Sequence, residues 1–208
     1  MQPIDTIIFD YGGVVADHYQ EPYQTQMAQK LGTDIAGAKK LVSEKEQHGA
    51  DYRLNKITKE QFWNKIKELS KTEFNHEEVH QLWVNTYQIN VQMVEFLKKL
   101  KQKGLQIGMA LNEDKDRWEY IKSTYHVDDF SSINILSFEI GLLKPHKEFY
   151  NEVLKQAHRI QNPERVLYVD DRQTHIDGAK YVGMQGYVFT TIDAFKTFLS
   201  SVHLVPFA

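Results

Sequence analysis

Residues 7–15 have the sequence Ile-Ile-Phe-Asp-Tyr-Gly-Gly-Val-Val. The apolar residues at its start are typical of the end of a buried strand. A carboxylate, Asp10, follows that strand directly, and two glycines come shortly after it. In an open parallel sheet, ligands bind beyond the carboxyl ends of the strands. Asp10 is therefore a candidate for chemistry, although Asp also follows many strands simply because it forms turns.

Strand and helix patterns alternate over the second half of the chain. Such alternation predicts βαβ units with right-handed crossovers and a parallel sheet. The first strand, at 6–9, is expected to join this sheet. The expected later strands are 105–111, 133–136, 165–169 and 186–189, and the expected helices are 91–103, 116–125, 146–158, 176–182 and 192–202.

Between residues 17 and 87 the apolar spacing is helical, and no strand pattern is present. Thr58 and Gln61 have the spacing of a capping box, which predicts a helix start. This stretch leaves the sheet just beyond the end of its first strand, so we expect it to lie over the site as a lid. The predicted fold is α/β. A Rossmann-like parallel sheet core, flanked by helices, comprises residues 1–15 and 88–208, and an inserted α-helical cap comprises residues 16–87.

The composition is that of an ordinary water-soluble protein, with 208 residues of which 41% are hydrophobic and 25% charged. A formal net charge of -3 gives no basic footprint, so nucleic acid is not an expected partner. The chain has no cysteine, which excludes disulfides and thiolate metal ligands. No apolar run approaches the ~20 residues that a membrane helix needs, and the first residues do not have a signal-peptide pattern. We expect no membrane partner and a cytoplasmic location.

Polar residues follow two further predicted strands. Lys144 lies in the loop after the third strand, and Asp170 and Asp171 follow the fourth. Alone, Lys144 could simply begin a helix, and the two aspartates could cap one. Together with Asp10 they are expected at one edge of the sheet, where carboxylates would repel one another unless a hard divalent cation lay between them. A lysine opposite such a cluster offsets the acids and an anionic substrate, which points to phosphoryl transfer.

These residues belong to motifs that are specific in combination. They are the Asp-x-x-Gly-Val pattern of Asp10–Val14, the Gly-Leu-Leu-Lys-Pro sequence of Gly141–Pro145, and Val-Asp-Asp at Val169–Asp171 with Gly178-Ala179 after it. The chain resembles the haloacid dehalogenase-like superfamily of hydrolases over its whole length. It looks most like the phosphatase branch with a helical cap after the first strand, and the stretch Asn55–Trp63 is similar to the cap of that branch.

The resemblance implies roles for individual residues. Asp10 would be the nucleophile that forms an aspartyl-phosphate. Lys144 would bridge the nucleophile and the phosphate, and Asn112 would help to bind the phosphate. The cofactor would be Mg²⁺. Its ligands would be Asp10, the backbone carbonyl of Gly12, Asp170 and Asp171.

Three positions depart from the family pattern. Most phosphatases of the family have an Asp where this chain has Gly12, and that carboxyl protonates the leaving oxygen and then activates water. General acid–base catalysis is typically worth ~10²–10⁴-fold in rate. Leu111 stands where a Ser or Thr usually donates to the phosphate, and His175 stands where Asn is common. The candidates for a replacement donor are Asn112, Arg117 and Arg172.

The expected activity is hydrolysis of small phosphorylated metabolites by a Mg²⁺-dependent phosphatase. Without an acid at Gly12, the enzyme is expected to favour good leaving groups such as sugar 1-phosphates. If the site is otherwise competent, an Asp introduced at Gly12 is expected to raise turnover on poorer leaving groups. The alternative is a catalytically impaired family member that acts as a phospholigand-binding or regulatory protein. Haloacid dehalogenase chemistry needs no metal, and the pair Asp170-Asp171 argues against it.

Overall fold

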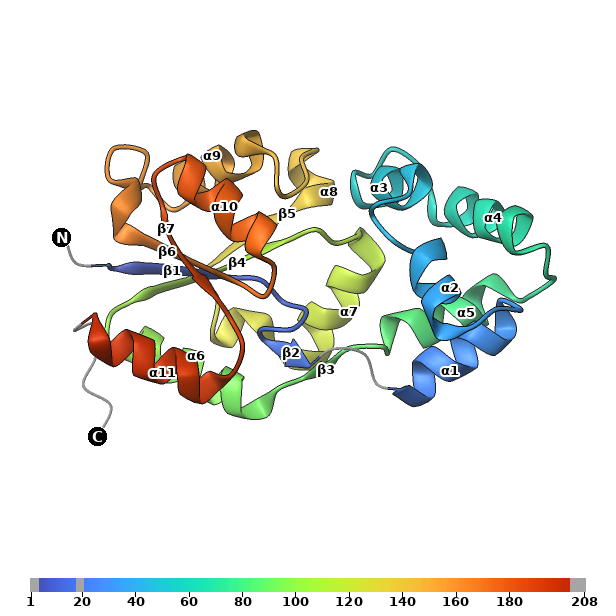
Figure 1. Cartoon of the computed structure of the whole chain (residues 1–208), viewed down its shortest axis with the longest axis horizontal. Coiled ribbons are helices and arrows are strands. Elements are labelled where there is room, and N and C mark those ends of the chain that lie inside the picture. The colour runs from blue at the N-terminus through green and yellow to red at the C-terminus, as the bar shows by residue number, and fades with distance from the viewer. Residues whose placement is uncertain (1–3, 18–20, 203–208) are drawn as a thin grey trace.

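The computed structural model describes residues 4–17 and 21–202 of the chain. Figure 1 shows a sheet covered by helices on both faces and, beside it, a separate group of helices. Within the described residues, no helix is long and apolar enough to cross a membrane. The fold is the predicted α/β class with an inserted helical cap.

Five parallel strands form the sheet, in the order β5-β4-β1-β6-β7. All five were predicted to within a residue. Phe9 is opposite both Met109 and Val169, so β1, at the centre, ends within two residues of its two neighbours. The residues that follow the three central strands therefore meet at one edge. The strand bounds are β1 Thr6–Phe9, β4 Gln106–Leu111, β5 Ile133–Leu136, β6 Val166–Asp170 and β7 Gln185–Val188.

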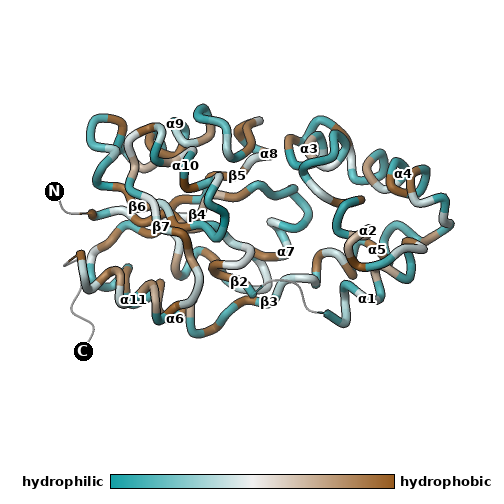
Figure 2. The backbone as a smooth tube through the Cα atoms, in the orientation of Figure 1, coloured by the Kyte–Doolittle hydropathy of each residue, from teal (hydrophilic) through white to brown (hydrophobic). Residues whose placement is uncertain are grey.

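Helices cover both faces of the sheet because alternate strand residues point to opposite sides. Ile7 and Phe9 pack with residues of α6, α7 and α11, whereas Ile8 packs with α9 and α10. Figure 2 shows hydrophobic residues gathered along the strands between these layers. The core helices are α6 Val91–Gln102, α7 Lys115–Tyr125, α8 Ser137–Ile140, α9 Lys147–Gln156, α10 Gln173–Tyr181 and α11 Ile192–Ser201, with short 3₁₀ turns η1 Val127–Asp129 and η2 Pro163–Arg165.

The cap has a hydrophobic core of its own, built largely from aromatic rings. The Tyr52 and Phe62 rings stack at 4.4 Å between centroids, and Trp63 and Trp83 are fully buried beside them. The capping box predicted at Thr58 is present. Among the described residues from 21 to 87 there is no strand, as expected. The cap helices are α1 Glu21–Lys30, α2 Ile35–Leu41, α3 Gln47–Arg53, α4 Lys59–Ser70 and α5 His76–Val84.

Two short strands join the cap to the sheet. β2 (Ala16–Asp17) pairs antiparallel with β3 (Gln88–Ile89), and the backbone N–H of Asn90 donates to the carbonyl of Val15 at 2.9 Å. The sequence did not predict this ribbon because a two-residue strand has no periodicity to detect. The segments leading into and out of the cap therefore lie side by side. The exact division of the chain at 15/16 and 87/88 stays a prediction.

Candidate active site

Lys144 lies between two of the predicted carboxylates. Its Nζ donates to Oδ1 of Asp10 at 2.8 Å, to Oδ2 of Asp170 at 3.0 Å and to the carbonyl of Ala110 at 2.9 Å. The side chain of Lys144 is only 1% exposed. Asp10 follows β1, Asp170 ends β6, and Lys144 comes from the loop between α8 and α9. Three residues far apart in the sequence thus meet at the sheet edge.

Asp171 completes an acidic group with Asp10 and Asp170. One carboxylate oxygen from each of the three residues lies within 4.8 Å of the others. Three carboxylates face one lysine, so the group keeps a net negative charge when all are ionised. Hard divalent cations prefer such oxygen ligands. The donor set therefore fits the predicted metal site.

Burial and charge act against each other on these groups. Burial raises the pKa of Asp10, although Lys144 partly opposes this. For Asp170, burial also raises the pKa, but Lys144 and His175 outweigh it and leave the pKa below its ordinary value. Burial would lower the pKa of Lys144, yet Asp10 and Asp170 raise it well above the usual range. Lys144 and Asp170 are consequently held as a charged pair.

His175, on the first turn of α10, also contacts Asp170. Its Nδ1 lies 2.9 Å from Oδ2 and 3.0 Å from Oδ1 of that residue. The backbone N–H of Arg172 donates to Oδ1 at 3.0 Å. Asp170 is thereby oriented from three sides, by Lys144, His175 and a backbone amide. The sequence marked His175 only as a departure, although its position five residues after Asp170, where a helix begins, is compatible with this contact.

Asn112 makes two hydrogen bonds to the backbone of Lys144. Its Oδ1 accepts from the N–H of Lys144 at 2.8 Å, and its Nδ2 donates to the carbonyl of Lys144 at 3.1 Å. This pairing fixes the loop that carries the lysine. Asn112 also lines the small cavity of about 50 Å³ beside Asp10, as does the buried Leu111. Its predicted contact with phosphate stays a prediction.

Tyr87 fills the space next to Gly12, a contact that the sequence did not predict. A Cβ added at Gly12 would lie 2.9 Å from Cε1 of Tyr87 and 3.0 Å from its Cζ and Oη. A larger residue at position 12 must therefore displace this ring. The effect of Asp at Gly12 on turnover therefore depends on this ring, and the expected increase stays a prediction. No local pattern announces the contact, because Tyr87 arrives from the far end of the cap.

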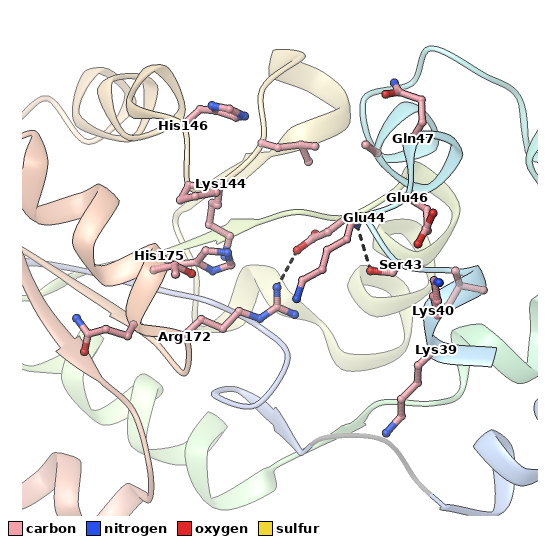
Figure 3. Close-up of a pocket in the computed structure, with 17 residues that line it drawn as sticks. Lys39, Lys40, Ser43, Glu44, Glu46, Gln47, Lys144, His146, Arg172 and His175 are labelled. Atoms are coloured by element: carbon pink, nitrogen blue, oxygen red, sulfur yellow. Dashed lines mark hydrogen bonds and ion pairs between the residues drawn. The ribbon is translucent and has the colours of Figure 1, made fainter. Parts of the chain in front are cut away.

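A cleft of about 1050 Å³ lies between the cap and the sheet edge (Figure 3). Glu44, from the cap, accepts a hydrogen bond from Arg172 of the core at 2.7 Å. Burial raises the pKa of Glu44, but Arg53 and Arg172 outweigh it, so the pKa is lowered. Glu44, Lys144, Arg172 and His175 line both this cleft and the small cavity beside Asp10. The cleft thus leads from solvent to the acidic group.

The fold agrees with the comparisons to known proteins. Residues 4–183 match the haloacid dehalogenase-like hydrolases, and the chain belongs to that family. A D-ribitol-5-phosphate phosphatase of Bacteroides thetaiotaomicron is 25% identical over 193 residues, which cover 88% of this chain and 91% of that one. A sesquiterpene phosphatase of Aspergillus oryzae is 30% identical over 102 residues, covering 49% and 50%.

Solved structures share the fold. A haloacid dehalogenase family enzyme of B. thetaiotaomicron, in complex with magnesium and inorganic phosphate, has a TM-score of 0.76 at 19% identity, covering 90% of this chain and 94% of that one. A predicted hydrolase of the same family from Porphyromonas gingivalis has a TM-score of 0.76 at 18% identity, covering 94% and 98%. At these identities the likeness concerns the fold.

Proposed function

We propose that this protein is a Mg²⁺-dependent phosphatase of small phosphorylated metabolites that works through an aspartyl-phosphate on Asp10. The observation that carries the proposal is the position of Lys144, whose Nζ contacts Asp10 and Asp170 at 2.8 and 3.0 Å. A nucleophilic carboxylate, an acidic cation site and a buried lysine in one place suit phosphoryl transfer, which depends on positioning and on neutralising charge. The named phosphatase relatives support the same reaction class.

The chain's own residues then have distinct tasks. Asp10 attacks phosphorus, and Lys144 holds the attacking carboxylate and offsets the charge of the phosphoryl oxygens. Asn112 fixes the backbone of Lys144. The cation would be held by Asp10, the carbonyl of Gly12, Asp170 and Asp171. When bound, Mg²⁺ supplies positive charge that stabilises the transferring group.

The basic residues that line the cleft favour a small anionic substrate. Lys39, Lys40 and Lys45 line its cap side, and Arg172 lines its core side close to the acidic group. Positive charge along such an entrance raises the local concentration of anions. The expected preference for sugar 1-phosphates assumes that nothing replaces the acid missing at Gly12. The Tyr87 ring lies where a side chain at position 12 would begin. The property to measure is therefore how the rate depends on the pKa of the leaving group.

The test is phosphate release from a panel of alkyl, anomeric and aryl phosphates, with Mg²⁺ or with EDTA. We expect release by the wild type with Mg²⁺, none with EDTA, and a loss of ~10⁴-fold or more for Asp10→Asn, as for other nucleophiles. Asp193→Asn is the matched control, because it makes the same change on an 87% exposed side chain of α11. Release that is indifferent to both metal and Asp10 would end the proposal.

A further inference from the structure

Tyr87 lies in the segment that returns the chain from the cap to the sheet, between α5 and β3. Its half-buried ring packs edge-on against Tyr11, with centroids 5.8 Å apart, and Tyr11 is the residue next to the nucleophile. Tyr87 also lines the small cavity that contains Asp10, Lys144 and Asn112. A phenol from the cap linker therefore reaches the place where the reaction is proposed to occur.

The glycine at position 12 is required by space and not by backbone conformation. In this loop Gly13 has a positive φ of 79°, which favours glycine, whereas Gly12 is not among the residues with positive φ. The constraint on Gly12 is instead the 2.9–3.0 Å approach of Cε1, Cζ and Oη of Tyr87 to its Cβ position. The hydroxyl end of Tyr87 thus occupies the volume where a side chain at position 12 would begin.

A phenol in that volume has suitable chemistry. Its hydroxyl both donates and accepts hydrogen bonds, and it can release its proton. The guanidinium carbon of Arg117 lies 4.5 Å from the centroid of the Tyr87 ring, where its positive charge stabilises the phenolate left after proton transfer. Arg117 is itself stacked on Trp83 at 4.7 Å and contacts Glu113 at 3.5 Å, so its position is fixed.

The donors suggested by the sequence do not have this chemistry. A carboxamide such as Asn112 has no acidic proton, and its amide is bonded to the backbone of Lys144. The guanidinium groups of Arg117 and Arg172 keep their protons at all relevant pH values. Tyr11, Glu44, Glu113 and His175 also line the small cavity and can carry a proton. Burial raises the pKa of Tyr11, Glu44 is bonded to Arg172 and His175 contacts Asp170. Glu113 instead faces Arg117, which lies beside the Tyr87 ring. Glu113 therefore serves as the competing candidate in the tests.

We propose that Tyr87 is the general acid and base of this enzyme, in place of the carboxyl group missing at Gly12; this inference rests on the proposed phosphatase function. A carboxylate oxygen of Asp10 bonds to phosphorus while the bond from phosphorus to the leaving oxygen breaks, and the Tyr87 proton passes to that oxygen to give the alcohol. A water molecule then gives a proton to the Tyr87 phenolate, and the water oxygen bonds to phosphorus. The bond from phosphorus to Asp10 breaks, and inorganic phosphate leaves.

This assignment changes the expected substrate class. With a proton donor at the leaving oxygen, the enzyme accepts alkyl phosphates, whose alkoxide leaving groups need protonation. It is not restricted to the good leaving groups predicted from Gly12 alone. A phosphorylated sugar alcohol or another primary alkyl phosphate is the chemistry that the site would then serve.

The first test is Tyr87→Phe, which removes only the hydroxyl oxygen. The measurement is kcat/KM, which reports the steps up to the aspartyl-phosphate, with glycerol 1-phosphate and with 2,4-dinitrophenyl phosphate. We expect a loss of ~10²–10⁴-fold on the alkyl phosphate and of less than ~10-fold on the aryl phosphate, whose leaving group needs no proton. A packing role would lower both equally. Equal losses, or none, would overturn the proposal.

The second test places Gly12→Asp in two backgrounds. In the wild type, the new side chain must displace the Tyr87 ring, so we expect activity on glycerol 1-phosphate to fall. In Tyr87→Ala, the space is open, and we expect the same substitution to raise activity. Gly12→Ala adds the Cβ without the carboxyl and should not rescue Tyr87→Ala. An increase of equal size in both backgrounds would show that the two groups do not share one position, against the proposal.

Glu113→Gln completes the set. We expect it to change kcat/KM for the two substrates by the same factor. A loss confined to the alkyl phosphate in Glu113→Gln, and absent in Tyr87→Phe, would assign the proton to Glu113 and overturn the proposal. Failure of the underlying function gives a different result, because the wild type and Asp10→Asn would then release phosphate equally or not at all.

Discussion

The core and the cap present their polar groups to the cleft in opposite ways. In the core, Asp10 and Asp170 adjoin the ends of paired strands, and Lys144 is buried with three hydrogen-bond acceptors. In the cap, Lys40 and Lys45 reach the cleft from exposed positions. The cap's aromatic core is buried, and none of its rings lines the cleft. The core's charges are therefore fixed before a substrate arrives, whereas most of the cap's charges are not.

Removing the lysine from the core gives the largest expected effect. Lys144→Met leaves Asp10 and Asp170 facing each other without the ammonium group of Lys144 between them. Breaking a buried charge pair in this way typically costs ~3–5 kcal/mol of stability. We expect a loss of that size in the free energy of unfolding at pH 7, measured with urea and without Mg²⁺, together with loss of phosphate release. Lys40→Met, the matched change in the cap, should stay within ~0.5 kcal/mol, as exposed positions do. Similar losses of stability for Lys144→Met and Lys40→Met would contradict the difference between core and cap.

Glu113 gives the next effect, and it depends on pH. Burial raises the pKa of Glu113 from 4.5 to about 7. The pKa of Glu113 is higher in the folded protein than in the unfolded chain. Its contribution to the free energy of unfolding is therefore fully present below pH 4.5 and is lost as the pH rises through about 7. At 1.36 kcal/mol per unit the change is about 3 kcal/mol. We expect Glu113→Gln to lack this decline and to gain stability relative to the wild type at pH 8.

The measurement is urea unfolding of both proteins at pH 5 and pH 8. Glu77, an exposed cap residue, provides the control, since hydrogen bonds from Gln81 and Lys59 lower its pKa. A lowered pKa acts in the opposite sense, so Glu77→Gln should lose a little stability at high pH. Parallel pH curves for the wild type and Glu113→Gln would show that the charge of Glu113 is not unfavourable in the fold.

The pair formed by Glu44 and Arg172 gives the smallest effect. It joins the cap to the core, and its Arg172 side chain is 48% exposed. Half-exposed pairs are worth up to ~1 kcal/mol and are weakened by salt. We expect Glu44→Gln to lower the free energy of unfolding by less than ~1 kcal/mol and to remove part of its salt dependence. A loss of 2 kcal/mol or more would mean that this cap group is as firmly held as those of the core.

The sequence was sufficient to predict the sheet and the residues at its edge. Asp10, Asp170 and Asp171 follow apolar strand patterns directly, so a parallel register is enough to bring them together. Lys144 was predicted because its loop follows a strand of the same sheet. These predictions need only local patterns and one rule about where parallel strands end.

The contacts between cap and core could not be predicted. Tyr87 meets Gly12, and Glu44 meets Arg172, through the way that the helical cap packs on the sheet. No spacing along the chain encodes that packing. From the sequence alone Gly12 indicates only a missing acid, whereas the structure places the Tyr87 ring 2.9–3.0 Å from the Cβ position of Gly12. Gly12 does not have a positive φ, which indicates that space and not backbone conformation requires a glycine there. This signal can be read only from the structure.

The central place of β1 has a consequence for how the protein is made. Thr6 pairs with Gln106 on one side and with Val166 on the other, whereas the cap helices between residues 21 and 84 contact mainly one another. During synthesis the cap helices are therefore complete, and can fold, long before the last strands of the sheet have left the ribosome. Until residues 166–170 emerge, Ile7, Ile8 and Phe9 lack one flanking strand. We expect this apolar segment to be the first that a chaperone binds on the growing chain.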